Sequence, residues 1–271
     1  MQKTRVKLPV YLISLPVIAS CVLRFFLLLN YTDKDTGYVK NGGEITVIIY
    51  VLLLVTALLT AFYSKNKQIS DNLLSFDKNI RLQRFSSAFL ALTFFIDFIH
   101  QCFNCYQELS KTVYVEYTYL AILIVSALFA LLCSFYFLCY SMTAGGFGYD
   151  FKNLRLFHFA PIVWAMARLL IMLLRIIDAK QDVESVLEFL TVVAAVAFMF
   201  CFVLMLDTNG SGTKALVFFS IFTFLLSLIL VIPRLIFILI GGFGLLPSVT
   251  YTSLNYLAFG IFAIVLINKK D

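Results

Sequence analysis

The sequence predicts an all-α membrane protein, a polytopic transmembrane helical bundle of about eight spans arranged as four hairpins. The first observation is composition, since 62% of the 271 residues are hydrophobic and 13% are charged. Soluble domains are closer to half apolar and a quarter charged. The second is a mean hydropathy of +0.95, which comes from apolar blocks near or above the roughly 20 residues that cross a bilayer. Together they exclude an ordinary soluble domain.

The apolar blocks are joined mostly by short connections, so we expect residues 1–271 to form a single integral membrane domain. The expected spans are 8–29, 45–63, 85–106, 115–141, 156–177, 185–206, 214–240 and 249–267. The residues before Cys21 look like a lipoprotein cleavage box, but the apolar run continues to Leu29 and favours a retained first span. The seventh span is overlong and contains Pro233, so we expect its outer part to kink, tilt or unwind.

Basic residues lie mostly on one side of the expected bundle. Thirteen flank the termini and the even connections: Lys3, Arg5, Lys7, Lys65, Lys67, Lys78, Arg81, Arg84, Lys152, Arg155, Lys214, Lys269 and Lys270. The odd connections hold four, which are Lys34, Lys40, Lys111 and Lys180. Because cytoplasmic loops carry the excess of Lys and Arg, we expect a multi-pass plasma-membrane protein with both termini cytoplasmic. The formal charge of +6 then reflects orientation in the membrane, not a nucleic-acid partner.

The longest connection, residues 64–84, has its own pattern. Apolar residues recur there at helical spacing: Ile69, Leu73, Phe76 and Ile80. The opposite face carries charges, so we expect a segment over residues 69–83 to lie as an amphipathic helix on the cytoplasmic membrane surface. A plain basic loop is the alternative.

Polar side chains within the spans gather in the outer half of the expected bundle. The third span carries a polar stripe at positions 97, 100, 101 and 104, which share one helical face. Charges at membrane depth are costly and usually face a partner or water. We therefore expect an outward-facing polar cavity with these candidate ligand-binding residues: Arg24, Asp97, His100, Gln101, Asn104, Arg168, Arg175 and Arg234.

Arginines outnumber acids at this depth. Asp97 is the acid best placed by depth to neutralise Arg24 or Arg168. Guanidinium groups left without an acid would suit an anionic ligand, because Arg matches carboxylate and phosphate with a planar fork of donors. His100, close to Asp97, would make such binding depend on pH. The alternative is that these residues only pair with one another and fix the packing. Acids near the starts of even spans suit the helix dipole: Glu44, Glu116, Glu184 and Glu188.

Other chemistries are less well supported. Cys102 and Cys105 form a CxxC pair, which raises thiol redox chemistry. The pair lies at the C-terminal end of its span, where the dipole opposes a thiolate. These cysteines, His100 and Asp97 do not converge on one face, which disfavours a metal site. We expect no catalytic residue, metal or cofactor.

The outer loop between the first two spans carries dense turn chemistry over Tyr31–Tyr38, and within it Asp33–Tyr38 forms a short motif. With Arg24 late in the first span, this loop resembles a group of uncharacterised multi-pass membrane proteins of Gram-positive bacteria, which have an Asp-x-x-Thr-Gly-aromatic first outer loop. The resemblance covers this loop, Arg24 and the pattern of spans. It implies a bacterial plasma-membrane location and brings no known activity.

Three functions are compatible with these patterns. The leading hypothesis is a protein that binds or transports a small anionic solute, or that recognises a lipid head group, through the outward-facing cavity. The second is a membrane sensor, or a scaffold for a protein partner, in which the charges only fix packing. The third is a membrane-embedded enzyme acting on a lipid-linked substrate, with Asp97 or His100 as base; the absence of a catalytic set argues against it. The lipid bilayer is a partner in all three.

Overall fold

The computed structural model describes residues 11–32, 42–66, 80–111, 116–143, 155–178, 183–207, 213–242 and 249–267. Within these ranges the secondary structure is helical, without strands. The α-helices are α1 (Tyr11–Tyr31), α2 (Glu44–Asn66), α3 (Ile80–Leu109), α4 (Tyr117–Thr143), α5 (Ala160–Asp178), α6 (Val183–Asp207), α7 (Thr213–Phe237) and α8 (Val249–Ile267). A short 3-10 helix, η2 (Arg155–Phe159), precedes α5, and a π-helix, η3 (Ile238–Gly242), follows α7.

The predicted all-α polytopic bundle is confirmed. Among the described residues, 7 helices are long and apolar enough to cross a membrane, and α8 adds a shorter apolar helix over Ser253–Ile267. The proposed surface segment 69–83 falls outside the described residues, except for its last residues, which belong to α3. The loop Asp33–Tyr38 also lies outside them.

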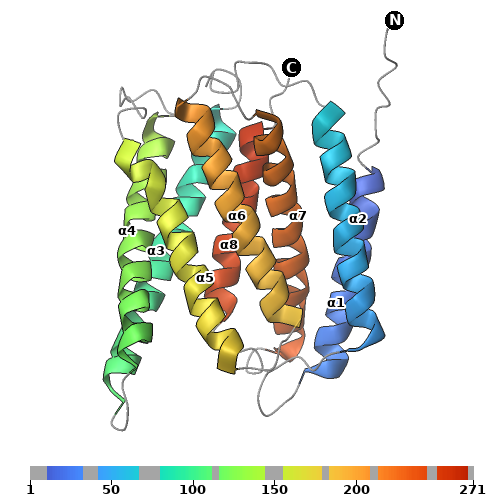
Figure 1. Cartoon of the computed structure of the whole chain (residues 1–271), viewed down its shortest axis with the longest axis horizontal. Coiled ribbons are helices and arrows are strands. Elements are labelled where there is room, and N and C mark those ends of the chain that lie inside the picture. Colours follow the sequence, from blue (N-terminus) through green and yellow to red (C-terminus); the bar gives the residue numbers. More distant parts are fainter. Residues whose placement is uncertain are drawn as a thin grey trace, which may run out of the picture.

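Figure 1 shows the helices side by side, each antiparallel to the one before it. Sequence neighbours pack as the four expected hairpins: α1 with α2, α3 with α4, α5 with α6, and α7 with α8. Helices α3 to α8 close into a ring, because α8 packs against α3 as well as α7. The α1–α2 hairpin lies outside this ring, against α7. We call the end where α1 begins and α8 ends the terminus end, and the opposite one the far end.

Local chemistry explains several helix boundaries. Gly43, with φ of +57°, precedes α2 in a left-handed conformation that glycine adopts without strain. Pro161 stands in the first turn of α5, where no helical N–H is needed. Helix α7 contains Pro233 and changes to π-helix after Phe237. The irregularity expected at the end of the seventh span is therefore present.

The outer surface of the bundle is apolar. On α1, for example, Leu15, Ile18 and Val22 follow one another at helical spacing and are 61–69% exposed. Such a surface is suited to lipid and not to water. The polar and charged side chains described below point inward instead.

The core of the terminus half is filled by ring side chains that we call the aromatic layer: Phe94, Tyr136, Phe137, Tyr140, Trp164, Phe198, Phe202, Phe259 and Phe262. Most contacts are edge-to-face, as between Phe94 and Trp164 with centroids 4.8 Å apart. A polar pair lies at its margin, where His158 Nδ1 is 3.0 Å from the Tyr136 hydroxyl.

Gly260 lets α8 approach α7 closely, because a Cβ there would overlap the Ser227 hydroxyl and lie 3.1 Å from Cα of Phe224.

Candidate functional site

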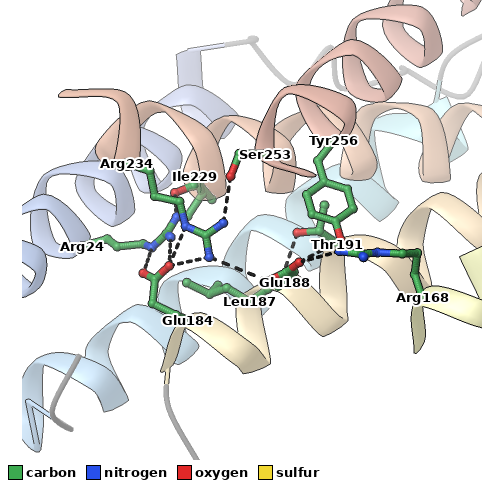
Figure 2. A network of polar contacts seen from close by, with 10 residues as sticks. All are labelled: Arg24, Arg168, Glu184, Leu187, Glu188, Thr191, Ile229, Arg234, Ser253 and Tyr256. Atoms are coloured by element: carbon green, nitrogen blue, oxygen red, sulfur yellow. Dashed lines mark hydrogen bonds and ion pairs between the residues drawn. The ribbon is translucent and has the colours of Figure 1, made fainter. Parts of the chain in front are cut away.

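A chain of charged side chains crosses the far half of the bundle (Figure 2). We call it the ion-pair network; its members are Arg24 on α1, Glu184 and Glu188 on α6, Arg234 on α7 and Arg168 on α5. The three arginines are 0–8% exposed, so they depend on protein partners rather than water. Both glutamates come from the first two turns of one helix, which places their carboxylates one turn apart.

Glu184 is the tightly bound centre of the network. Arg24 Nε donates to Glu184 Oε1 at 2.7 Å, and Arg24 Nη2 donates to Oε2, which makes this pair bidentate. Arg234 Nε donates to the same Oε2 at 2.7 Å. Arg234 Nη1 also donates to Ser253 Oγ at 2.9 Å and so reaches α8. Bidentate charge-assisted bonds are the strong class of hydrogen bond, so Glu184 holds α1, α6, α7 and α8 together.

A proline explains the other partner of Arg24. Pro233 has no N–H, so the carbonyl of Ile229, four residues earlier in α7, loses its helical donor. Arg24 Nη1 donates a hydrogen bond to that carbonyl. Freed backbone groups at membrane depth must be satisfied within the protein. Helix α1 therefore supplies the donor that α7 lacks.

Glu188 is held much more loosely. The Tyr256 hydroxyl donates to its Oε1 at 2.9 Å. The nearest arginine nitrogens stay beyond hydrogen-bond distance, with Arg168 Nη2 3.8 Å from Oε1 and Arg234 Nη2 3.9 Å from Oε2. Exposure does not explain why Glu188 is held more loosely than Glu184, because the two side chains are 12% and 14% exposed. The difference comes from the positions of the donors around each carboxylate.

Arg168 is the arginine with the poorest hydrogen bonding in the network. It lies beside the Tyr256 hydroxyl and forms the long ion pair with Glu188. Its Nε is buried and has no hydrogen-bond partner among the described residues. A buried donor left unsatisfied costs about 1–3 kcal/mol. Arg168 is thus the group in this network that a further acceptor would satisfy best.

Asp97 extends the network to α3. Trp164 Nε1 donates to its Oδ2 at 2.8 Å, and Gln101 Nε2 donates to Oδ1 at 3.4 Å. Asp97 also interacts electrostatically with Arg168. The same Trp164 ring packs against Phe94, so this one side chain joins the ion-pair network to the aromatic layer.

The structure brings together some of the predicted site residues. Arg24, Arg168 and Arg234 meet in the network, and buried Asp97 and Gln101 lie beside it. Farther along the stripe, Asn104 Nδ2 lies 3.3 Å from His100 Nδ1, and both residues are partly exposed. The side chain of Arg175 lies outside the described part of the chain.

The structure bears on two expectations about charge. Asp97 was expected to neutralise Arg24 or Arg168, and of these two it interacts with Arg168, whereas Arg24 pairs with Glu184. The expected excess of arginines over acids included Arg175, whose side chain is not described, so it stays a prediction. Among the described side chains of the site, three guanidinium groups face three carboxylates.

Sequence reasoning missed several members of the site. Glu184 and Glu188 were interpreted as acids that suit a helix dipole, a role that their place at the start of α6 also permits. The available signal was their spacing of four residues, together with Thr191 on the same helical face. Ser253, Tyr256 and the Ile229 carbonyl gave no such signal.

Comparisons with protein-family models, with curated proteins and with solved structures found no match. The resemblance to membrane proteins of Gram-positive bacteria therefore stays a prediction. What the site can do has to be inferred from its geometry and charge.

Proposed function

We propose that this chain binds a small anionic solute and carries it across the membrane, with Arg168 as the main contact. The observation that supports this most strongly is the buried Arg168 Nε without a partner, beside an ion pair stretched to 3.8 Å. A guanidinium offers five donors in a planar fork that matches carboxylate and phosphate oxygens. A bound oxyanion would satisfy the free donor and shorten the loose contact.

The direction of entry follows from orientation, which is part of the same proposal. With both termini in the cytoplasm of a plasma-membrane protein, the far end of the bundle faces outward. The excess of basic residues around the terminus end supports this orientation. The ion-pair network then lies in the outer half, and the solute reaches Arg168 from outside.

A second candidate function is a sensor or scaffold in which the network only fixes packing. The Glu184 centre favours it, because its bonds of 2.7–2.9 Å tie together four helices. Under this hypothesis no solute exists. The two functions predict different behaviour for variants of Arg168.

The test is thermal unfolding of the purified full chain in lipid nanodiscs, titrated with sodium acetate, sodium phosphate or sodium sulfate at constant ionic strength. We expect at least one of these anions to raise Tm of the wild type, and Arg168→Gln to abolish the effect. Arg81→Gln, an exposed residue of α3, is the matched control and should respond as the wild type does. Glycerol phosphate serves as a further arm that detects recognition of a lipid head group.

Two results would contradict binding at Arg168: no anion stabilises the wild type, or Arg168→Gln responds as strongly as the wild type. If Arg168→Gln does not fold, Arg168→Lys replaces it, because it keeps the charge and loses the fork. We expect this variant to fold and to bind the anion about tenfold more weakly, a loss of about 1.4 kcal/mol. Uptake of the labelled anion into proteoliposomes then separates transport from binding alone.

A further inference from the structure

We propose that Glu188 is the proton-accepting group of this site, so that a proton and the anion bind together. The inference rests on the proposed function, because it concerns the same anion at Arg168. Glu188 acts as the counter-ion of Arg168 and Arg234 in the structure. A proton on Glu188 cancels its charge and leaves Arg168 for the incoming anion, while Arg234 stays bonded to Glu184.

The contrast between the two glutamates selects Glu188. Both lie on α6 one turn apart, but Glu184 accepts three hydrogen bonds from Arg24 and Arg234. Protonation of Glu184 would disrupt these bonds. The ion pairs of Glu188 measure 3.8 and 3.9 Å, and no arginine hydrogen bond to it would be lost. Arg24 is also fixed to the Ile229 carbonyl, whereas Arg168 Nε has no partner among the described residues.

Tyr256 can serve both states of Glu188. Its hydroxyl donates to the carboxylate Oε1 at 2.9 Å (Figure 2). A hydroxyl is also an acceptor, so after protonation the carboxyl O–H can donate to the Tyr256 oxygen instead. The hydrogen bond between α6 and α8 is kept with its direction reversed. Protonation therefore breaks no hydrogen bond at Glu188.

The balance of charges explains why binding of the anion is coupled to binding of a proton. Among the described side chains, the charged and titratable groups around Glu188 are Arg168 on α5, Arg234 on α7, Tyr256 on α8 and Glu184 on α6 itself. Arg24 on α1 and Asp97 on α3 act through Glu184 and Arg168. The described set of three arginines and three carboxylates is neutral. A bound monoanion alone would leave a net negative charge in a low-dielectric site, and one proton restores neutrality.

The proposal has a definite sign. The anion binds more tightly as the pH falls, because the protonated form of Glu188 is the form that accepts it. Because one proton is taken up with each anion, the affinity should decrease by up to about tenfold for each unit by which the pH rises. Glu188→Gln resembles the protonated carboxyl in shape and charge. Its affinity should therefore be high and nearly independent of pH.

The experiment measures binding of sodium acetate and of sodium sulfate by the full chain in nanodiscs, between about pH 6 and pH 8, where both probes keep a constant charge. We expect tighter binding at low pH for the wild type and pH-independent binding for Glu188→Gln. Glu44→Gln, an exposed glutamate at the start of α2, is the matched control and should keep the wild-type pH dependence. In weakly buffered solution, acetate should cause uptake of one proton per anion by the wild type and none by Glu188→Gln.

The outcomes separate the two proposals. If Glu188→Gln keeps the wild-type pH dependence, or if acetate binds without proton uptake, Glu188 is not the proton site, while binding at Arg168 stands. If neither probe binds the wild type at any pH, the proposed function fails, and this inference fails with it. Should Glu188→Gln not fold, Glu188→Ala replaces it, because it also lacks the carboxyl group and should take up no proton when acetate binds.

Discussion

The two halves of the bundle are buried by different means. In the far half, Arg24, Glu184 and Arg234 are charged groups, each held by a specific partner on another helix. In the terminus half, Phe137 packs against Phe94, Phe259 and Phe262 without polar contacts between the rings. Lipid is as apolar as these rings, so the aromatic layer is favoured by close packing and not by escape from water.

The difference between the two halves shows where side chains can exchange one partner for another. An aromatic ring that moves leaves a void, whereas a guanidinium that leaves one carboxylate can bind another anion. The far half therefore combines a fixed centre at Glu184 with an exchangeable one at Glu188. The terminus half is held by the close packing of its aromatic rings. Each prediction below perturbs one of these parts.

The largest effect is expected for Glu184→Ala. The substitution leaves two buried guanidinium groups without their carboxylate, and the breaking of a buried pair typically costs about 3–5 kcal/mol. Reversible unfolding in mixed micelles measures the loss. Glu44→Ala, at an exposed helix start, is the control and should change the free energy of unfolding very little. Equal effects of the two substitutions would show that the Glu184 centre does not hold the helices together.

The next effect is expected for Phe137→Ala in the aromatic layer. Loss of a fully buried ring leaves a cavity, and truncation of Phe to Ala in a packed core costs about 3 kcal/mol or more. Phe135→Ala is a close control, because Phe135 lies on the same helix and is 56% exposed. The same unfolding assay measures the loss of stability of both variants. Folded Phe137→Ala should still bind the anion as the wild type does. Loss of binding along with stability would contradict the separation of the two halves.

The smallest effect is a coupling between Arg24 and Pro233. Arg24→Lys keeps a positive charge for Glu184 but gives up the second arm that bonds the Ile229 carbonyl. Pro233→Ala restores the helical N–H to that carbonyl. Arg24→Lys should therefore cost about 1 kcal/mol less in the Pro233→Ala background than in the wild type. A double-mutant cycle in mixed micelles gives this value, and strict additivity would contradict the link.

The fold could be predicted from the sequence because span length and apolar composition are local properties. Eight apolar blocks appear in the chain, and the four hairpins follow from short connections. The partners within the site could not be predicted in the same way. Depth along a span is fixed by position in the sequence, whereas the neighbour of a side chain also depends on how each helix is rotated and placed. Asp97 and Arg24 share a similar depth and still have different partners.

Glu184 illustrates a second limit. An acid in the first turn of a helix has a sufficient local explanation in the helix dipole, so nothing in α6 alone points to arginines on α1 and α7. The Ile229 carbonyl, freed by Pro233, is a similar case. A proline in a helix indicates that the carbonyl four residues earlier has lost its helical donor. Only the packed bundle shows that Arg24 supplies the missing hydrogen bond.

The bonds of Arg24 also set an order for biosynthesis. Its partners Glu184 and Ile229 lie 160 and 205 residues later in the chain. The first hairpin therefore leaves the ribosome long before either partner has been made. Helix α1 cannot reach its final place against α7 until α7 itself has been synthesised. An early helix of this chain thus depends on a much later one for its final position.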